Sequence, residues 1–196
     1  QQLGHISRRV RGLFISIEQK DEIKEILRNW PVQDVRFAVV TDGGRILGLG
    51  DLGINGMGIP IGKLILYTSC GGVPPEYTLP IVLDVGTNNE EFLNDPLYPG
   101  LRRKRTRGPE FDSFIAAFVE AMNEVFPNAC FQWDDFTGVD AIRILENYRD
   151  LKLVPKEFKT EELCNLALNI TFHALLFIDQ DFITSELCEK LVKKDG

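Results

Sequence analysis

Apolar residues recur with two different spacings along the chain, and together these spacings predict strands followed by helices. Continuous apolar or β-branched runs of strand length occupy residues 12–17, 35–41, 79–84 and 129–133. Apolar positions three and four residues apart predict helices at residues 21–30, 109–125 and 141–148. Asp21 is the expected N-cap of the first helix, and Pro109 is expected in the first turn of the second.

Strands that alternate with helices build mostly parallel sheets, because each crossover helix returns the chain to the same edge. We therefore predict an α/β fold with a mostly parallel sheet flanked by helices. Residues 62–69 fit either a helix or a strand, since so short an apolar run shows no clear period. A short helical tail is expected in residues 155–196.

A glycine-rich stretch follows the second predicted strand. Eight glycines occur between residues 43 and 62. Such density indicates tight backbone geometry or close approach to a small ligand. The same stretch contains Arg45 and Asp51, and Lys63 then enters an apolar run. We expect chemistry here more than elsewhere in the chain.

Residues 48–53 match the G-x-G-x-x-G pattern of dinucleotide-binding folds. That pattern should open a helix, with an acidic residue about 20 positions later. Residues 54–60 contain two glycines and a proline, and we expect them to be a poor helix start. The pattern alone is weak, but a generic α/β nucleotide-binding domain remains an alternative.

Three predicted strands end in aspartate: Asp42, Asp84 and the pair Asp134 and Asp135. The carboxyl ends of parallel strands meet at one edge of the sheet, where ligands bind. We therefore expect a negatively charged cluster suited to a hard divalent cation. Alternatively, Asp134 and Asp135 cap the helix that follows them.

Arg45 and Lys63 each have two interpretations. Arg45 could pair with Asp42 or Asp51, or it could bind a substrate carboxylate. Lys63 could extend from an apolar face to solvent. Near a metal and partly desolvated, a lysine instead has a lowered pKa and serves as a general base.

The overall charge argues against some partners. The 196 residues have a net charge of −7 and a sequence pI near 5.0, which disfavours general binding to nucleic acid or anionic membrane. The basic run at residues 102–107 is therefore expected to be a solvated face. No signal peptide or membrane span is expected, and four cysteines without a C-x-x-C pair indicate reduced thiols in an intracellular protein.

Several long motifs resemble the malic enzymes. They are Thr-Asp-Gly-Gly-Arg-Ile-Leu-Gly-Leu-Gly-Asp-Leu-Gly at residues 41–53, Gly-Met-Gly-Ile-Pro-Ile-Gly-Lys-Leu at 56–64 and Asp-Val-Gly-Thr-Asn-Asn at 84–89. Shorter similar segments occupy residues 11–17, 95–101 and 131–136. The resemblance implies a malic-enzyme N-terminal-like domain in residues 1–154 and leaves residues 155–196 as a tail of unknown role.

This resemblance implies oxidative decarboxylation of L-malate to pyruvate and carbon dioxide, with NAD or NADP and with Mg²⁺ or Mn²⁺. It implies that Lys63 is the general base toward the C2 hydroxyl and that Arg45 binds a malate carboxylate. Asp134 and Asp135 match the metal ligands. The resemblance also implies a homo-oligomer in the cytoplasm or the mitochondrial matrix.

The chain departs from the family pattern in ways that bear on activity. Asp134 stands where the family usually has the longer glutamate. The segment with a third metal aspartate is expected just after Val154, where Pro155 and Lys156 stand instead. The catalytic tyrosine is expected upstream of Gln1, and the nucleotide-binding domain is expected after the matched region. We therefore expect little or no turnover; the alternative is a non-catalytic, truncated partner of intact subunits.

Overall fold

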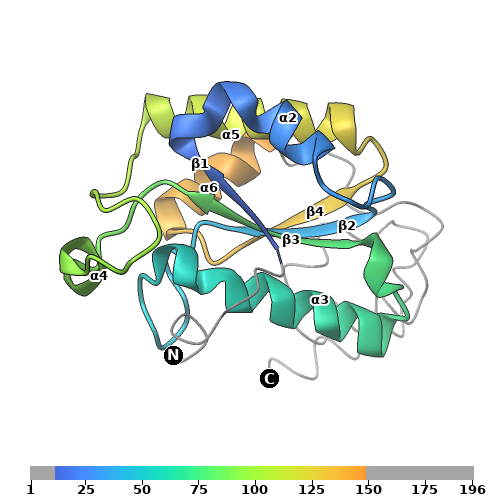
Figure 1. Cartoon of the computed structure of the whole chain (residues 1–196), viewed down its shortest axis with the longest axis horizontal. Helices are drawn as coiled ribbons and strands as arrows, with labels where there is room; N and C mark the ends of the chain where they lie inside the picture. Colours follow the sequence, from blue (N-terminus) through green and yellow to red (C-terminus); the bar gives the residue numbers. More distant parts are fainter. Residues whose placement is uncertain (1–11, 149–196) are drawn as a thin grey trace, which may run out of the picture. The chain divides into compact units, whose positions relative to one another are not determined.

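The computed structural model describes residues 12–148, which lie in the first of two units that meet at Leu151. Their strands form one parallel sheet in the order β1-β3-β2-β4 (Figure 1). The strands are β1 (Leu13–Ser16), β2 (Phe37–Thr41), β3 (Thr78–Asp84) and β4 (Cys130–Asp134). The predicted α/β fold is confirmed, whereas the predicted tail at residues 155–196 lies outside the described residues.

Helices cover both faces of this sheet. Helices α2, α5 and α6 lie on one side of the sheet, and α3 lies on the other (Figure 1). Their bounds are α2 (Ile23–Arg28), α3 (Gly58–Gly71), α4 (Glu90–Asn94), α5 (Pro109–Val125) and α6 (Gly138–Tyr148). Short 3-10 turns complete the described elements: η1 (Ile17–Glu22), η2 (Gly53–Met57) and η3 (Pro75–Tyr77).

The main hydrophobic core lies between the sheet and α5. Side chains alternate along a strand, so Ala38 and Val40 of β2 enter this core while Phe37 faces α3. Phe118 of α5 contacts the rings of Phe131 and Trp133 edge to face, at centroid distances of 6.3 and 5.9 Å. The core therefore fixes β2 and β4 side by side, and these two strands end beside the candidate site.

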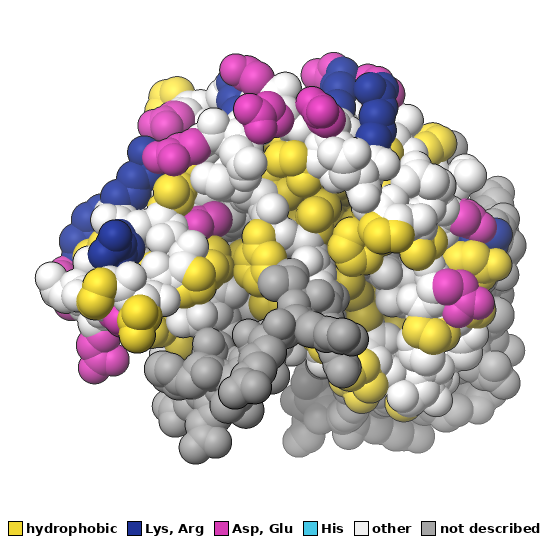
Figure 2. All heavy atoms as spheres, in the orientation of Figure 1, with side chains coloured by type: hydrophobic (Ala, Val, Ile, Leu, Met, Phe, Trp, Pro, Cys, Tyr) yellow, Lys and Arg dark blue, Asp and Glu magenta, His cyan; other side chains and the backbone are white. Residues whose placement is uncertain are grey.

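The outer surface of α2 and α5 is polar. Figure 2 shows acidic and basic side chains gathered along this side of the molecule. Lys24 of α2 pairs with Glu120 and Glu124 of α5 at 3.1 and 2.6 Å, and Arg28 pairs with Glu124 at 2.8 Å. Exposed pairs of this kind contribute little to stability, but they leave this face without an apolar patch.

The predicted strands and the long helix at Pro109 are confirmed, with strand starts that differ by at most two residues. The ambiguous residues 62–69 belong to helix α3. This helix ends at Gly72, whose left-handed φ of 68° lets its N–H donate to the carbonyl of Tyr67. The apolar pattern of residues 62–69 does not identify a helix, but the glycine that follows them marks where the helix ends.

Two sequence expectations about helix starts were wrong. Residues 54–60 do begin a helix, since η2 runs directly into α3. A glycine favours close packing within that start, because a Cβ on Gly56 would lie 3.1 Å from the Cα of Gly43, tighter than most such contacts. Asp21 is not an N-cap; Ser16 begins η1 by accepting the N–H of Glu18, and Gln19 completes the capping box.

Among residues 12–148, no helix combines the length and the apolar character that a membrane crossing needs. Cys70 is exposed and Cys130 is buried. Cys164 and Cys188 lie outside the described residues. The reduced state of the cysteines stays a prediction.

Candidate functional site

The glycine loop, residues 42–53, leaves the end of β2 and returns to its own start. Ile46 and Gly50 form an antiparallel bridge, and the N–H of Leu52 donates to the carbonyl of Gly43 at 2.9 Å. Gly43 has a φ of 65°, and a Cβ there would lie 2.1 Å from the carbonyl oxygen of Gly53. The glycines therefore allow the chain to approach itself, as tight backbone geometry predicts.

Arg105 holds both ends of the glycine loop. Its Nη1 lies 2.9 Å from Oδ2 of Asp42, and its Nη2 donates to the carbonyl of Asp42 at 2.8 Å. Its Nε and Nη2 also donate to the two carboxylate oxygens of Asp51, at 2.7 and 2.8 Å. The side chains of Arg105 and Asp42 are each 1% exposed, so this ion pair is shielded from solvent.

This arrangement corrects two expectations. The basic run at residues 102–107 is not wholly a solvated face, because Arg105 points inward and is buried. Asp42 and Asp51 pair with Arg105 and not with Arg45, which is exposed. The sequence offered a weak signal for this pairing, since two acidic residues in a compact glycine loop require a cation from elsewhere in the chain.

The pKa values of the two carboxylates in this loop are shifted in opposite directions. Burial raises the pKa of Asp42 to about 6, although Arg105 and the N–H of Gly44 act against that rise. Burial also pushes the pKa of Asp51 upward, but hydrogen bonds from Arg105 and the amide of Asn88 outweigh it, and the net pKa is lowered. Asp51 therefore remains the stronger acceptor for Arg105 near neutral pH.

A second polar cluster joins α3 to β4. The Nζ of Lys63 lies 3.0 Å from both carboxylate oxygens of Asp134. One turn further along α3, the hydroxyl of Tyr67 donates to the side chain of Gln132. Positions four apart share a helix face and positions two apart share a strand face, so these contacts repeat along the two elements.

Asp135 connects this cluster to the glycine loop. It adopts a φ of 53°, and its carbonyl accepts the N–H of Arg45 at 3.0 Å. Burial, followed by the charge of Asp134, raises the pKa of Asp135, while Lys63 acts in the opposite direction. We call the group that consists of Arg45, Lys63, Asp134 and Asp135 the carboxyl-end site.

The structure thus places these four predicted residues together beyond the ends of β2 and β4. The main chain of Arg45 bonds to Asp135, and the side chain of Lys63 bonds to Asp134. Asp134 does not cap α6, which begins at Gly138. The contact of Lys63 with Asp134, and the main-chain bond that holds Arg45 beside Asp135, are compatible with one bound diacid, whereas the roles of these residues stay predictions.

The wider aspartate cluster is not present as we expected. The strand ends do meet, since Ser16 lies opposite Asp84 and Thr41 lies opposite Asp134. However, Asp84 accepts the N–H groups of Gly86 and Leu101 at 3.0 and 2.8 Å, and Asp42 pairs with Arg105. Within residues 12–148, no group of three or more His, Cys, Asp or Glu side chains could hold a metal ion.

Two carboxylates nonetheless fit a partial site for Mg²⁺ or Mn²⁺. Asp134 and Asp135 offer oxygen donors, which these hard cations prefer. Oδ2 of Asp134 is buried and lies 3.0 Å from the ammonium of Lys63. Within the described residues, no donor reaches this oxygen with the geometry of a hydrogen bond. Because Mg²⁺ is often held by one or two carboxylates together with substrate and water, this donor set fits such an ion.

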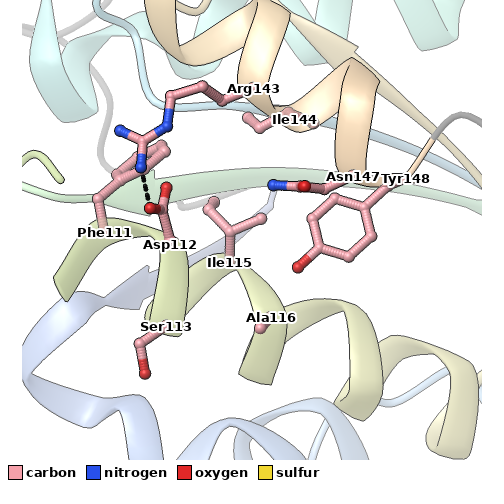
Figure 3. Close-up of a pocket in the computed structure, with 9 residues that line it drawn as sticks. All are labelled: Phe111, Asp112, Ser113, Ile115, Ala116, Arg143, Ile144, Asn147 and Tyr148. Atoms are coloured by element: carbon pink, nitrogen blue, oxygen red, sulfur yellow. Dashed lines mark hydrogen bonds and ion pairs between the residues drawn. The ribbon is translucent and has the colours of Figure 1, made fainter. Parts of the chain in front are cut away.

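A separate hollow lies between α5 and α6, on the opposite side of the sheet from α3. It has a volume of about 270 Å³ and contains none of the four predicted site residues. Figure 3 shows Arg143 of α6 reaching Asp112 of α5 across its rim, while Ile115 and Tyr148 line its apolar part. The single ion pair is satisfied within the hollow, so no unpaired charge there points to a ligand.

Comparisons with known proteins agree over most of the chain. A family model described as malic enzyme, N-terminal domain, matches residues 1–149. An NAD-dependent malic enzyme of Erwinia tasmaniensis is 55% identical over 150 residues, and an NADP-dependent malic enzyme of Rattus norvegicus is 56% identical over 151 residues. Each match covers 76% of this chain and 26% of the relative. The chain therefore spans about a quarter of the length of these curated relatives.

Proposed function

Because this chain belongs to the malic enzyme family, we propose that its described residues form the substrate- and metal-binding part of an enzyme that converts L-malate to pyruvate and carbon dioxide. The observation behind this proposal is the carboxyl-end site, where the ammonium of Lys63 contacts Asp134 and the main chain of Arg45 is bonded to Asp135 at the end of a parallel sheet. Ligands of parallel α/β sheets bind beyond this edge.

The reaction has four parts. Malate loses the proton of its C2 hydroxyl, a hydride from C2 and carbon dioxide from C4, and C3 gains a proton. When bound, NAD or NADP accepts the hydride, and Mg²⁺ or Mn²⁺ acts as a Lewis acid toward the C2 oxygen. Relatives named for either nucleotide match at nearly equal identity, so this region favours neither.

In this proposal, Lys63 is the base for the hydroxyl proton. Its side chain is 35% exposed, so the amine can reach solvent and a small ligand. Its Nζ lies 3.0 Å from the carboxylate oxygens of Asp134. A divalent cation on Asp134 would compete with the amine for those oxygens and leave the amine to contact the C2 hydroxyl.

Arg45 would bind a carboxylate of malate. Its main chain is fixed by the bond to Asp135, while its side chain is exposed and forms no ion pair with residues 12–148. A guanidinium placed in this way offers two parallel donors to a carboxylate. Asp134 and Asp135 would hold the cation, and this assignment gives every member of the carboxyl-end site a role.

Titration with Mn²⁺ tests the metal part of the proposal. We expect Asp135→Asn to weaken Mn²⁺ binding by about tenfold or more, because one of two carboxylates loses its charge. Asp112→Asn is the matched control, since Asp112 lies between α5 and α6. Equal Mn²⁺ affinity of the parent and Asp135→Asn would refute the metal assignment.

We further propose that this 196-residue chain shows little or no turnover by itself. Two carboxylates give an incomplete cation site, and the matched region is about a quarter of the length of its relatives. An assay with malate, Mn²⁺ and each nucleotide in turn tests this. Turnover comparable with that of an intact malic enzyme would contradict the proposal.

A second candidate is a non-catalytic partner of intact malic enzyme subunits, or a homo-oligomer. The observation that favours it is the exposed apolar surface of α3, where Ile65 and Leu66 are 56% and 51% exposed. Size-exclusion chromatography of the chain, alone and with an intact malic enzyme, separates these outcomes. Co-elution that Ile65→Lys abolishes would support the partner role, and a monomer in both runs would exclude it.

A further inference from the structure

We propose that Arg105 is a positioning residue, which fixes the glycine loop and thereby sets the location of Arg45. This inference rests on the proposed function for the role of Arg45, but its structural part stands on the contacts of Arg105 itself. None of the motifs that resemble the malic enzymes draws attention to this arginine, which lies in the basic run at residues 102–107.

A single guanidinium closes the base of the loop. All three nitrogens of Arg105 are engaged: Nη1 with Asp42, Nε with Asp51, and Nη2 with both residues. Asp42 and Asp51 are the two residues at which the loop leaves and rejoins the body of the protein. Lysine offers a point charge and cannot make this forked set of bonds, so the geometry requires arginine.

The segment that contains Arg105 is itself fixed to the end of β3. The N–H of Thr106 donates to the carbonyl of Val85 at 2.8 Å, and the N–H of Arg105 donates to Oδ1 of Asn88 at 3.3 Å. Thr87 and Asn88 donate in turn to the carboxylate of Asp51, at 2.9 and 2.7 Å. Arg105 therefore connects the end of β3 to the glycine loop and holds the loop in place relative to that strand.

Arg45 lies between two points that this network holds. On one side, the N–H of Gly44 donates to Oδ1 of Asp42 at 2.8 Å, and a Cβ on Gly44 would lie 3.1 Å from Cζ of Arg105. On the other side, the buried side chain of Ile46 precedes an exposed tip at residues 47–50. Because the tip makes few contacts, the base that Arg105 closes and the bond from the N–H of Arg45 to the carbonyl of Asp135 together determine where Arg45 lies.

Amide hydrogen exchange of the chain tests the positioning role directly. In Arg105→Lys and Arg105→Met, we expect the N–H groups of Arg45 and Leu52 to exchange at least about tenfold faster than in the parent. The N–H groups of Val40 and Leu83, in the central strands, should change by less than about twofold. Arg102→Met removes a neighbouring exposed cation and should leave all of these rates unchanged.

Ligand binding distinguishes a positioning role from a general effect on stability, because only a positioning role predicts different effects on the affinities for malate and for Mn²⁺. If Arg105 positions Arg45, Arg105→Lys should weaken L-malate binding in the presence of Mn²⁺ by about tenfold, while the affinity for Mn²⁺ alone stays within about twofold. Mn²⁺ binding should be spared because the contacts of Arg105 within residues 12–148 are with Asp42, Asp51 and Asn88 and not with the carboxylates of Asp134 and Asp135.

Several results would overturn the proposal. Uniform acceleration of exchange, or loss of folding in both variants, would make Arg105 a general determinant of stability. Unchanged exchange at Arg45 and Leu52 would show that the loop does not depend on it. If the parent does not bind malate, the proposed function of this chain fails, and the exchange rates still decide whether Arg105 positions the loop.

Discussion

The buried ion pair between Arg105 and Asp42 gives the strongest expectation at the scale of single residues. Each side chain is 1% exposed, so each charge has lost nearly all of its hydration. Burial raises the pKa of Asp42 to about 6, whereas its ordinary value is 3.8. The folded protein therefore binds this proton more tightly than the unfolded chain does.

That difference in pKa predicts a pH-dependent stability. The contribution of Asp42 is complete below pH about 4 and is lost as the pH rises through about 6, because ionisation is disfavoured in the folded state. Relative to Asp42→Asn, the free energy of unfolding of the parent should fall by about 2–3 kcal/mol between about pH 4 and pH 7. Urea unfolding of both proteins across this range measures the difference.

The exposed Asp21 supplies the matched control for this experiment. Asp21→Asn makes the same chemical change on the surface and should leave the pH dependence of unfolding parallel to that of the parent. A difference between the parent and Asp42→Asn that grows in the opposite direction, or that does not vary with pH, would contradict the raised pKa.

At the scale of elements, the contact between α3 and β4 orients the face that contains Lys63. The hydroxyl of Tyr67 donates to Gln132, and burial raises the pKa of this tyrosine to about 12, so the hydroxyl keeps its proton at neutral pH. Its ring also contacts Phe37 edge to face, at 6.5 Å between centroids. Tyr67 therefore fixes α3 to two strands one turn away from Lys63.

Tyr67→Phe should destabilise the fold by about 1–2 kcal/mol, because the acceptor of Gln132 loses its partner while the ring packing remains. Thermal or urea unfolding measures this loss. Tyr77→Phe is the control, since it retains the ring that lies 4.2 Å from the guanidinium of Arg36. An equal loss in the two variants would show that the Tyr67 hydroxyl has no special role.

The sequence was informative where one strong signal determines an element. Strand-length apolar runs and the proline at the start of α5 predicted β1 to β4 and α5 nearly to the residue. It failed at η2, where the glycines suggested a break, because close packing of Gly56 against Gly43 is a tertiary requirement that local propensity does not contain. It also failed at η1, where Ser16 forms the cap that we assigned to Asp21.

The candidate site was predictable to a similar degree. Parallel strands bring their ends together, so the meeting of Asp134 and Asp135 with Lys63 and Arg45 follows from topology once the motifs are recognised. The partner of Asp42 and Asp51 was not predictable, because Arg105 is 54 residues beyond Asp51 in sequence and sits in a run of exposed cations. Only the fold shows which of those cations turns inward.

At the scale of the whole molecule, the sheet of the described residues has the charged outer faces of α2 and α5 on one side, together with α6, and α3 with exposed apolar side chains on the other (Figure 1). The negative net charge of −7 is consistent with binding a small diacid only where cations are concentrated locally. Arg45 and Lys63 supply that concentration at the carboxyl-end site, and Arg105 is neutralised by its own carboxylates. The cationic groups that the proposed substrate would meet at the carboxyl-end site are therefore Arg45, which is exposed, and Lys63, which also pairs with Asp134.

The central claim is that these two cations and two carboxylates bind L-malate together with a divalent cation. Calorimetric titration of L-malate into the chain in the presence of Mn²⁺ tests it most directly, with Arg45→Met compared with Arg102→Met. We predict Mn²⁺-dependent malate binding that Arg45→Met weakens by about tenfold or more and Arg102→Met leaves unchanged. Absence of binding by the parent, or equal affinities in the two variants, would contradict the account.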